Sequence, residues 1–130
     1  MVLNHDDLLE MNIHVDEETG RIAGVVDWAD AYTAPFGLSL WGLETLLGVQ
    51  TSSSGWKWHP DEGYLREQFW KTLYASIGHR SEDDRRAIEV ARLLGLFRSS
   101  GFDRRPEEPN AQPVGEDHFE FVRLEALCLR

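Results

Sequence analysis

The sequence predicts an α+β fold in which a short β-hairpin packs on a mostly helical lobe. Two strand-like stretches separated by a turn come first, and stretches with helical spacing of apolar residues follow. The chain has 130 residues, of which 42% are hydrophobic, and it contains five tryptophans and six phenylalanines. This is enough material for one modest core.

The hairpin is predicted from residues 12–28. Residues 12–16 alternate between apolar and polar side chains, as a half-buried strand does. Glu17–Gly20 has turn chemistry, and Gly20 tolerates a positive φ. Residues 21–28 are rich in β-branched side chains and bring the carboxylate of Asp27 to the end of the second strand. Acidic groups therefore lie at the ends of the hairpin.

Three helices are expected after the hairpin. The first is predicted over 35–48, and the Ser-, Thr- and Gly-rich residues 49–55 are interpreted as a loop. The second is predicted over 61–77, because apolar residues recur there every four positions. The third begins at Ser81, which acts as N-cap with an acid three residues later. Its predicted buried residues are Ile88, Ala91, Leu94 and Leu96 or Phe97.

Composition divides the chain into three predicted parts. Residues 1–102 form the hairpin and helical lobe. Residues 103–116 contain three prolines and almost no apolar side chains, so they are interpreted as a linker. Residues 117–130 have a pattern compatible with a short C-terminal helix or tail.

Charge and cysteine content limit the functional classes. The formal net charge of −10 argues against a nucleic-acid or anionic-membrane partner and favours a cationic substrate or a metal. The single cysteine, Cys128, cannot form an internal disulfide, so a reducing, cytoplasmic setting is expected. No apolar stretch approaches the roughly 20 residues that span a bilayer, and no signal peptide is visible. We expect a soluble protein.

The strongest chemical signal lies near the start of the chain. His5, Asp7 and Asn12 fit the pattern His-x-Asp-x-x-x-x-Asn, and Asp27 follows fifteen residues after Asn12. Phosphoryl transfer requires a group that accepts the proton of the attacking hydroxyl, and oxygen ligands for a divalent metal. An Asp on a loop, an Asn five residues later and an Asp ending the next strand have the side chains for these roles.

These residues resemble those of the aminoglycoside phosphotransferase and choline kinase-like family, whose loop reads His-Gly-Asp-Leu-x-x-x-Asn. The resemblance covers about the first 35 residues and includes Val-Val-Asp-Trp-Ala-Asp-Ala, which is similar to the family's Ile-Asp-Trp-Glu-x-Ala. It implies that Asp7 is the catalytic residue, that Asn12 and Asp27 bind Mg²⁺, and that His5 and Asp30 support the site. It further implies the C-terminal lobe of a kinase-like fold, ATP as the phosphoryl donor, and a small hydroxylated substrate such as an amino sugar or amino alcohol.

The sequence also departs from the family pattern. Asp6 replaces the usual Gly and adds a second carboxylate beside Asp7, where like charges repel. The family's N-terminal lobe holds the nucleotide with a Gly-rich loop and a strand lysine, whereas this chain has two lysines, Lys57 in an aromatic segment and Lys71 in a predicted helix. The chain is therefore expected to carry the C-terminal lobe alone and to be inactive by itself.

Three alternatives follow from these departures. The chain is one half of a phosphotransferase, a non-catalytic binding lobe, or an unrelated hydrolase that uses the acidic cluster and a metal. An uncovered lobe surface would favour a homodimer. Trp56, Trp58 and His59 either line a substrate cleft or fold their segment onto the helical core.

Overall fold

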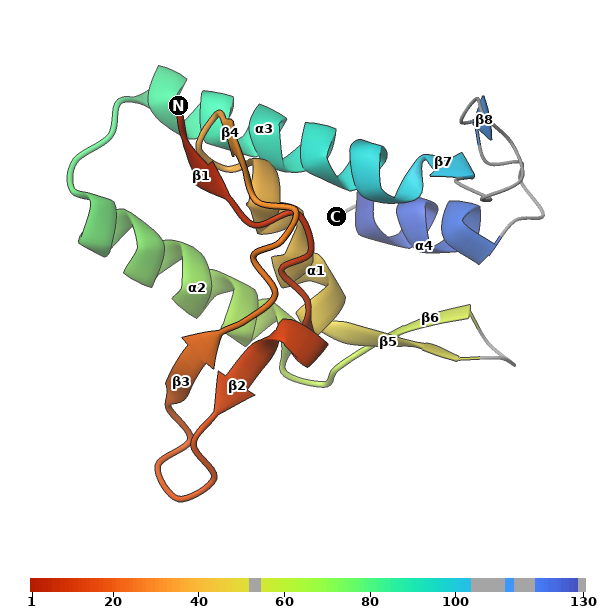
Figure 1. Ribbon diagram of the computed structural model, residues 1–130, viewed down its shortest axis with the longest axis horizontal. Helices are drawn as coiled ribbons and strands as arrows, with labels where there is room; N and C mark the ends of the chain where they lie inside the picture. Colours follow the sequence, from red (N-terminus) through yellow and green to blue (C-terminus); the bar gives the residue numbers. More distant parts are fainter. Residues whose placement is uncertain (52–54, 104–111, 114–118, 129–130) are drawn as a thin grey trace.

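Small antiparallel sheets and α-helices alternate along the chain in the computed structural model, which describes residues 1–51, 55–103, 112–113 and 119–128 (Figure 1). The α+β class predicted from the sequence is confirmed. The helices are α1 (Trp41–Leu46), α2 (Glu62–Ile77), α3 (Glu82–Ser100) and α4 (Phe119–Cys128), with short 3₁₀ helices η1 (Glu10–Asn12) and η2 (Leu38–Leu40). The strands are β1 (Val2–Asn4), β2 (Ile13–Val15), β3 (Ile22–Val25), β4 (Tyr32–Ala34), β5 (Gly48–Thr51), β6 (Gly55–Trp58), β7 (Phe102–Asp103) and β8 (Gln112–Pro113).

The predicted hairpin is formed by β2 and β3, which project away from the helices (Figure 1). Its turn is held by Asp16, whose Oδ1 accepts hydrogen bonds from the backbone N–H and the hydroxyl of Thr19, both at 2.7 Å. These bonds lower the pKa of Asp16 below its ordinary value. Gly20 adopts φ 67°, a conformation that favours glycine.

A further sheet joins the start of the chain to the segment after the hairpin. β1 pairs antiparallel with β4, so that Asn4 lies opposite Tyr32. Three-residue strands separated by 27 residues carry too little local pattern to be predicted. This pairing holds together the two ends of residues 5–31, the segment that contains the predicted site residues.

The loop predicted over residues 49–55 is wrong in part, because β5 and β6 form another hairpin there. The Ser- and Thr-rich composition of residues 49–55 hid the paired strand residues, among them Gly55, which adopts φ 71°. Trp56 and Trp58 meet edge to face at 5.7 Å and pack against the hydrophobic core. The hairpin is thereby fixed to the helical body.

The core lies where α1, α3 and α4 meet. Trp41, Leu96, Leu124 and Leu127 form one buried cluster. The predicted C-terminal helix is thus present as α4, beside the C-terminal half of α3 (Figure 1). The predicted buried face of α3 is confirmed for Ile88, Ala91 and Leu96 and is wrong for Leu94, which is exposed.

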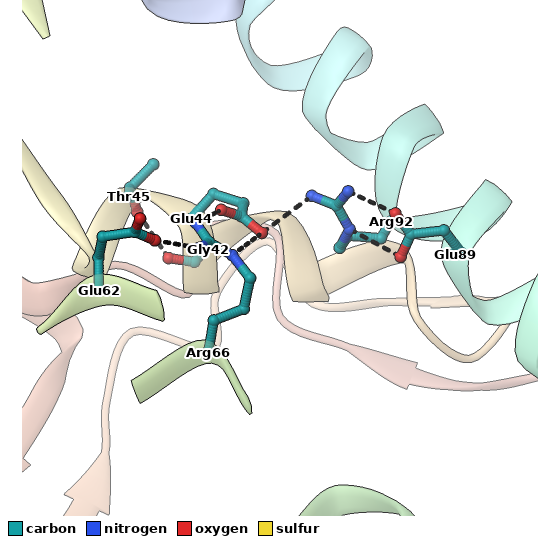
Figure 2. Close-up of polar contacts among 7 residues, drawn as sticks. All are labelled: Gly42, Glu44, Thr45, Glu62, Arg66, Glu89 and Arg92. Carbon is teal, nitrogen blue, oxygen red and sulfur yellow. Dashed lines mark hydrogen bonds and ion pairs between the residues drawn. The ribbon is translucent and has the colours of Figure 1, made fainter. Parts of the chain in front are cut away.

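Arg92 lies on the buried face of α3, where it belongs to an ion-pair network that joins three helices (Figure 2). The carboxylate of Glu44 in α1 accepts hydrogen bonds from Arg66 of α2 at 2.7 Å and from Arg92 of α3 at 3.3 Å. Glu62 pairs with Arg66, and Glu89 pairs with Arg92. Burial alone lowers the pKa of Arg92, but its bonds and charge interactions with Glu89 and Glu44 outweigh burial and raise that pKa.

This network links α2 to the body through the ion pair between Arg66 and Glu44. The predicted bounds of α2 are confirmed to within one residue. None of the residues of this helix is buried. Arg66 also lies over the ring of Trp58, 5.1 Å from its centroid. Arg66 therefore helps to attach α2, whose apolar residues are at most half-buried, to the body.

The predicted N-cap of α3 is confirmed. Ser81 Oγ accepts from the backbone N–H of Asp84 at 3.1 Å, and Asp84 Oδ2 accepts from the backbone N–H of Ser81 at 3.0 Å. These reciprocal bonds form a capping box. The bonds from Ser81 lower the pKa of Asp84.

Ser81→Ala is expected to lower the free energy of unfolding at pH 7 by about 1 kcal/mol. Because the pKa of Asp84 is lowered in the folded state, the contribution of this cap is present above the unfolded pKa of an Asp and is lost as pH falls through the folded pKa. Urea denaturation at pH 7 and at acidic pH measures this dependence. Ser76→Ala, which removes an exposed bond to the backbone oxygen of Thr72 in the last turn of α2, is the control, and an equal loss in both variants would contradict the prediction.

Most of the segment predicted as a linker lies outside the described residues. Its described parts are Asp103 in β7 and Gln112–Pro113 in β8, two strands that pair. The domain boundaries stay a prediction. Among the helices of the described residues, none has both the length and the apolar character needed to cross a membrane.

Candidate functional site

The loop between β1 and β2 carries three of the predicted site residues, and Asn4 anchors its start. The side chain of Asn4 is buried, and its Oδ1 accepts from the backbone N–H and hydroxyl of Ser39 at 3.3 and 3.0 Å. Its Nδ2 donates to the backbone oxygens of Val2 and Pro35. The bonds to Ser39 and Pro35 connect the end of β1 to the segment that enters α1.

His5 is buried and uses both ring nitrogens inside the loop. Nδ1 accepts a hydrogen bond from the backbone N–H of Asp7 at 3.1 Å, so the neutral ring carries its proton on Nε2. Nε2 lies 2.7 Å from the backbone oxygen of Val26, to which this proton is donated. Trp28 packs edge-on against the ring at 4.8 Å. His5 therefore connects the loop to the end of β3.

Asn12 completes the connection from the other side. Its Nδ2 donates to the backbone oxygen of Asp7 at 2.8 Å and to Asp7 Oδ2 at 3.1 Å. Its backbone oxygen accepts from the N–H of Val26 at 3.0 Å. Asn12 is buried, and since Nδ2 is directed at Asp7, the side-chain oxygen is the atom that remains for another partner.

Val26 is thus bound through both backbone groups, and Asp27 follows it. Asp27 is exposed and has φ 62°, the left-handed region that residues other than glycine seldom occupy. Such a conformation costs on the order of 1 kcal/mol and is common at functional sites. The sequence placed a carboxylate at this strand end, but only the structure shows its unusual backbone.

The structure brings His5, Asp7 and Asn12 together by direct hydrogen bonds. Asp27 is joined to them through its neighbour Val26. Asp30 lies three residues further on, in an exposed turn, and makes none of these bonds. The predicted set therefore divides into the hydrogen-bonded group of His5, Asp7 and Asn12, the adjacent carboxylate of Asp27, and the more distant acid Asp30.

The oxygen donors of this group suit a hard cation. The Asn12 side-chain oxygen and the Asp27 carboxylate are the kind of ligands that Mg²⁺ uses together with water and substrate phosphates. Among the described residues, no group of three or more His, Cys, Asp or Glu side chains is placed to hold a metal ion.

Asp6 points away from this group and contacts α3. Its carboxylate forms an ion pair with Arg98, and Arg98 Nη1 also donates to the hydroxyl of Tyr32 at 2.7 Å. These two partners were missed in the sequence, because they lie 92 and 26 positions from Asp6. The one available signal was Asp6 itself, which stands where the family pattern has Gly.

A cavity of about 320 Å³ lies beside the loop. Its lining includes Glu10 of η1, Thr45 of α1, and Gln50 and Trp56 of the β5–β6 hairpin. Trp56 therefore both packs on the core and lines a cavity. A larger cavity of about 460 Å³, lined mainly by apolar residues such as Phe36, Ile77 and Ile88, does not include the loop.

Gly42 allows α1 to approach the loop closely, since a β-carbon at this position would overlap the backbone oxygen of Leu8. Gly42→Ala is expected to lower the free energy of unfolding by about 1–3 kcal/mol and to shift the NMR signals of Asp7 and Asn12. Gly63→Ala in α2 is the control, because open space surrounds that position and alanine favours the helix. Unchanged stability in Gly42→Ala would show that the close approach is not needed.

Comparison with known proteins supports a phosphotransferase-like N-terminal part. Residues 1–56 match the model of the phosphotransferase enzyme family. This stretch contains the loop, the β2–β3 hairpin, α1 and the start of β6. Neither the curated proteins nor the solved structures give a match.

Proposed function

We propose that this chain is the C-terminal lobe of a kinase-like phosphotransferase, which uses ATP and Mg²⁺ to phosphorylate a hydroxyl group of a small molecule. The observation that carries the proposal is the bonded group of His5, Asp7 and Asn12 on the end of β3, next to Asp27. The family match over residues 1–56 supports it independently. The lone cysteine favours a cytoplasmic enzyme.

Asp7 is assigned as the general base. Asn12 binds Asp7 Oδ2 and the Asp7 backbone oxygen, which holds the carboxylate in one orientation. Oδ1 has no hydrogen bond within the described part of the chain, so it is the atom assigned to accept the proton of the attacking hydroxyl. The bond from the Asp7 backbone N–H to His5 restrains the same residue from its other side.

Asn12 and Asp27 are assigned as the protein ligands of Mg²⁺, which when bound neutralises charge on the phosphate oxygens. One amide and one carboxylate leave most coordination positions to water and phosphate, as is usual for this ion. The left-handed backbone of Asp27 supports the assignment, since local strain of this kind persists where function requires it.

The acceptor substrate is assigned to the 320 Å³ cavity. This volume is in the range of small-molecule sites, and the cavity adjoins Glu10, three residues after Asp7. The carboxylate of Glu10 and the carboxamide of Gln50 suit a substrate with hydroxyl or amino groups. An amino sugar or amino alcohol has this chemistry.

Calorimetry and a coupled ADP assay test the proposal. If the chain alone binds Mg-ATP, EDTA and Asp27→Ala are expected to abolish the metal-dependent part of the binding, whereas Asp7→Asn is expected to keep it and to lose any ADP release stimulated by amino sugars or amino alcohols. Unchanged binding in Asp27→Ala would overturn the metal assignment. The absence of binding at millimolar Mg-ATP would exclude phosphoryl transfer by this chain alone and would favour a non-catalytic binding lobe.

A further inference from the structure

Arg98, in the last turn of α3, contacts two segments that flank the candidate site. Its guanidinium pairs with Asp6, the residue immediately before Asp7. It also lies over the ring of Tyr32 with 4.7 Å to the centroid, and donates to the Tyr32 hydroxyl. Tyr32 is the β4 partner of Asn4, the residue immediately before His5. Arg98 thus joins α3 to the loop and to β4, whose partner strand β1 leads into the loop.

Asp6 and Asp7 direct their carboxylates to different partners. Asp6 is bound by Arg98 on the outside of the loop, whereas Asp7 is bound by Asn12. Without Arg98, the second carboxylate beside Asp7 would lose its ion pair and keep, among the described residues, only its contact with Tyr32. The Arg98 contact accounts for how an Asp is accommodated where the family pattern has Gly.

We propose that Arg98 is a positioning residue, which by holding Asp6 keeps the backbone of the loop in the conformation that places Asp7 against Asn12. The inference rests on the proposed role of Asp7 as general base. The contacts described for Arg98 are with Asp6 and Tyr32, neither of which is a reacting group, so its assigned action is through Asp6.

Because the ion pair between Arg98 and Asp6 is partly exposed, its effect on the position of the loop can be separated from an effect on the free energy of unfolding. The side chain of Arg98 is 45% exposed and that of Asp6 is 26% exposed. Exposed ion pairs of this kind contribute little to global stability. The loss of Arg98 should therefore change the loop and leave the unfolding transition almost unchanged.

NMR on the whole chain, without nucleotide or metal, tests this inference. In Arg98→Ala, we expect the Asn12 side-chain amide signals to shift and the Asp7 backbone amide, which donates to His5, to exchange with solvent at least about tenfold faster. Arg98→Lys should retain most of the protection. Arg85→Ala is the matched control, because Arg85 also lies on α3 and over a tyrosine ring, that of Tyr74, at 4.7 Å.

A double-mutant cycle tests whether Arg98 acts through Asp6. In an Asp6→Asn background, Arg98→Ala should produce little further change at Asp7 and Asn12. Unchanged signals in Arg98→Ala, or an equal effect in both backgrounds, would overturn the inference. Because these measurements need neither Mg²⁺ nor ATP, their failure is distinct from failure of the proposed phosphoryl transfer.

Discussion

Glu44→Ala is expected to lower the free energy of unfolding by about 3–5 kcal/mol, the magnitude found when one partner of a buried ion pair is removed. Glu44 is 2% exposed and lies between Arg66 and Arg92, as Figure 2 shows. Its removal leaves the 3% exposed Arg92 with Glu89 alone, whose side chain is 46% exposed. It also removes the main ion pair between α2 and the body.

Urea denaturation followed by circular dichroism measures the change. Glu67→Ala is the control, since Glu67 is an exposed acid on α2 next to Arg66 in sequence. Glu44→Gln should cost less than Glu44→Ala, because the carboxamide oxygen still accepts a hydrogen bond from either arginine. A loss below about 1 kcal/mol in Glu44→Ala would show that water or another acid replaces the carboxylate.

Asp27→Gly is expected to weaken metal binding at least about 100-fold while leaving the fold equally stable or about 1 kcal/mol more stable. The carboxylate is an assigned Mg²⁺ ligand, so its loss removes affinity. Glycine adopts φ 62° without strain, so the same substitution relieves the backbone. A variant that loses binding and keeps or gains stability is not a misfolded one.

Mn²⁺ is a suitable probe for this experiment, because it broadens the NMR signals of nearby groups and Mg²⁺ should compete with it. Broadening at the Asn12 side-chain amide is expected in the wild type and absent in Asp27→Gly. Glu17→Gln, which removes an exposed acid from the turn of the same hairpin, should behave as the wild type. Equal broadening in Asp27→Gly would remove Asp27 from the metal site.

The sequence alone predicted the features that depend on neighbouring residues. The β2–β3 hairpin, the bounds of α2 and the capping box of α3 follow from alternation, four-residue spacing and an N-cap pair, all of which act within a few residues. The spacing of His5, Asp7 and Asn12 could be read for the same reason. Their roles in catalysis and metal binding stay predictions.

The tertiary structure decided which distant residues support this group. Glu44 binds arginines 22 and 48 positions away, and Asp6 binds an arginine 92 positions away. No periodicity marks such partners, because an ion pair between helices depends on how the helices pack and not on spacing along the chain. A buried Arg92 and an exposed Leu94 on one helix follow from that packing, which reverses what local hydrophobicity predicts.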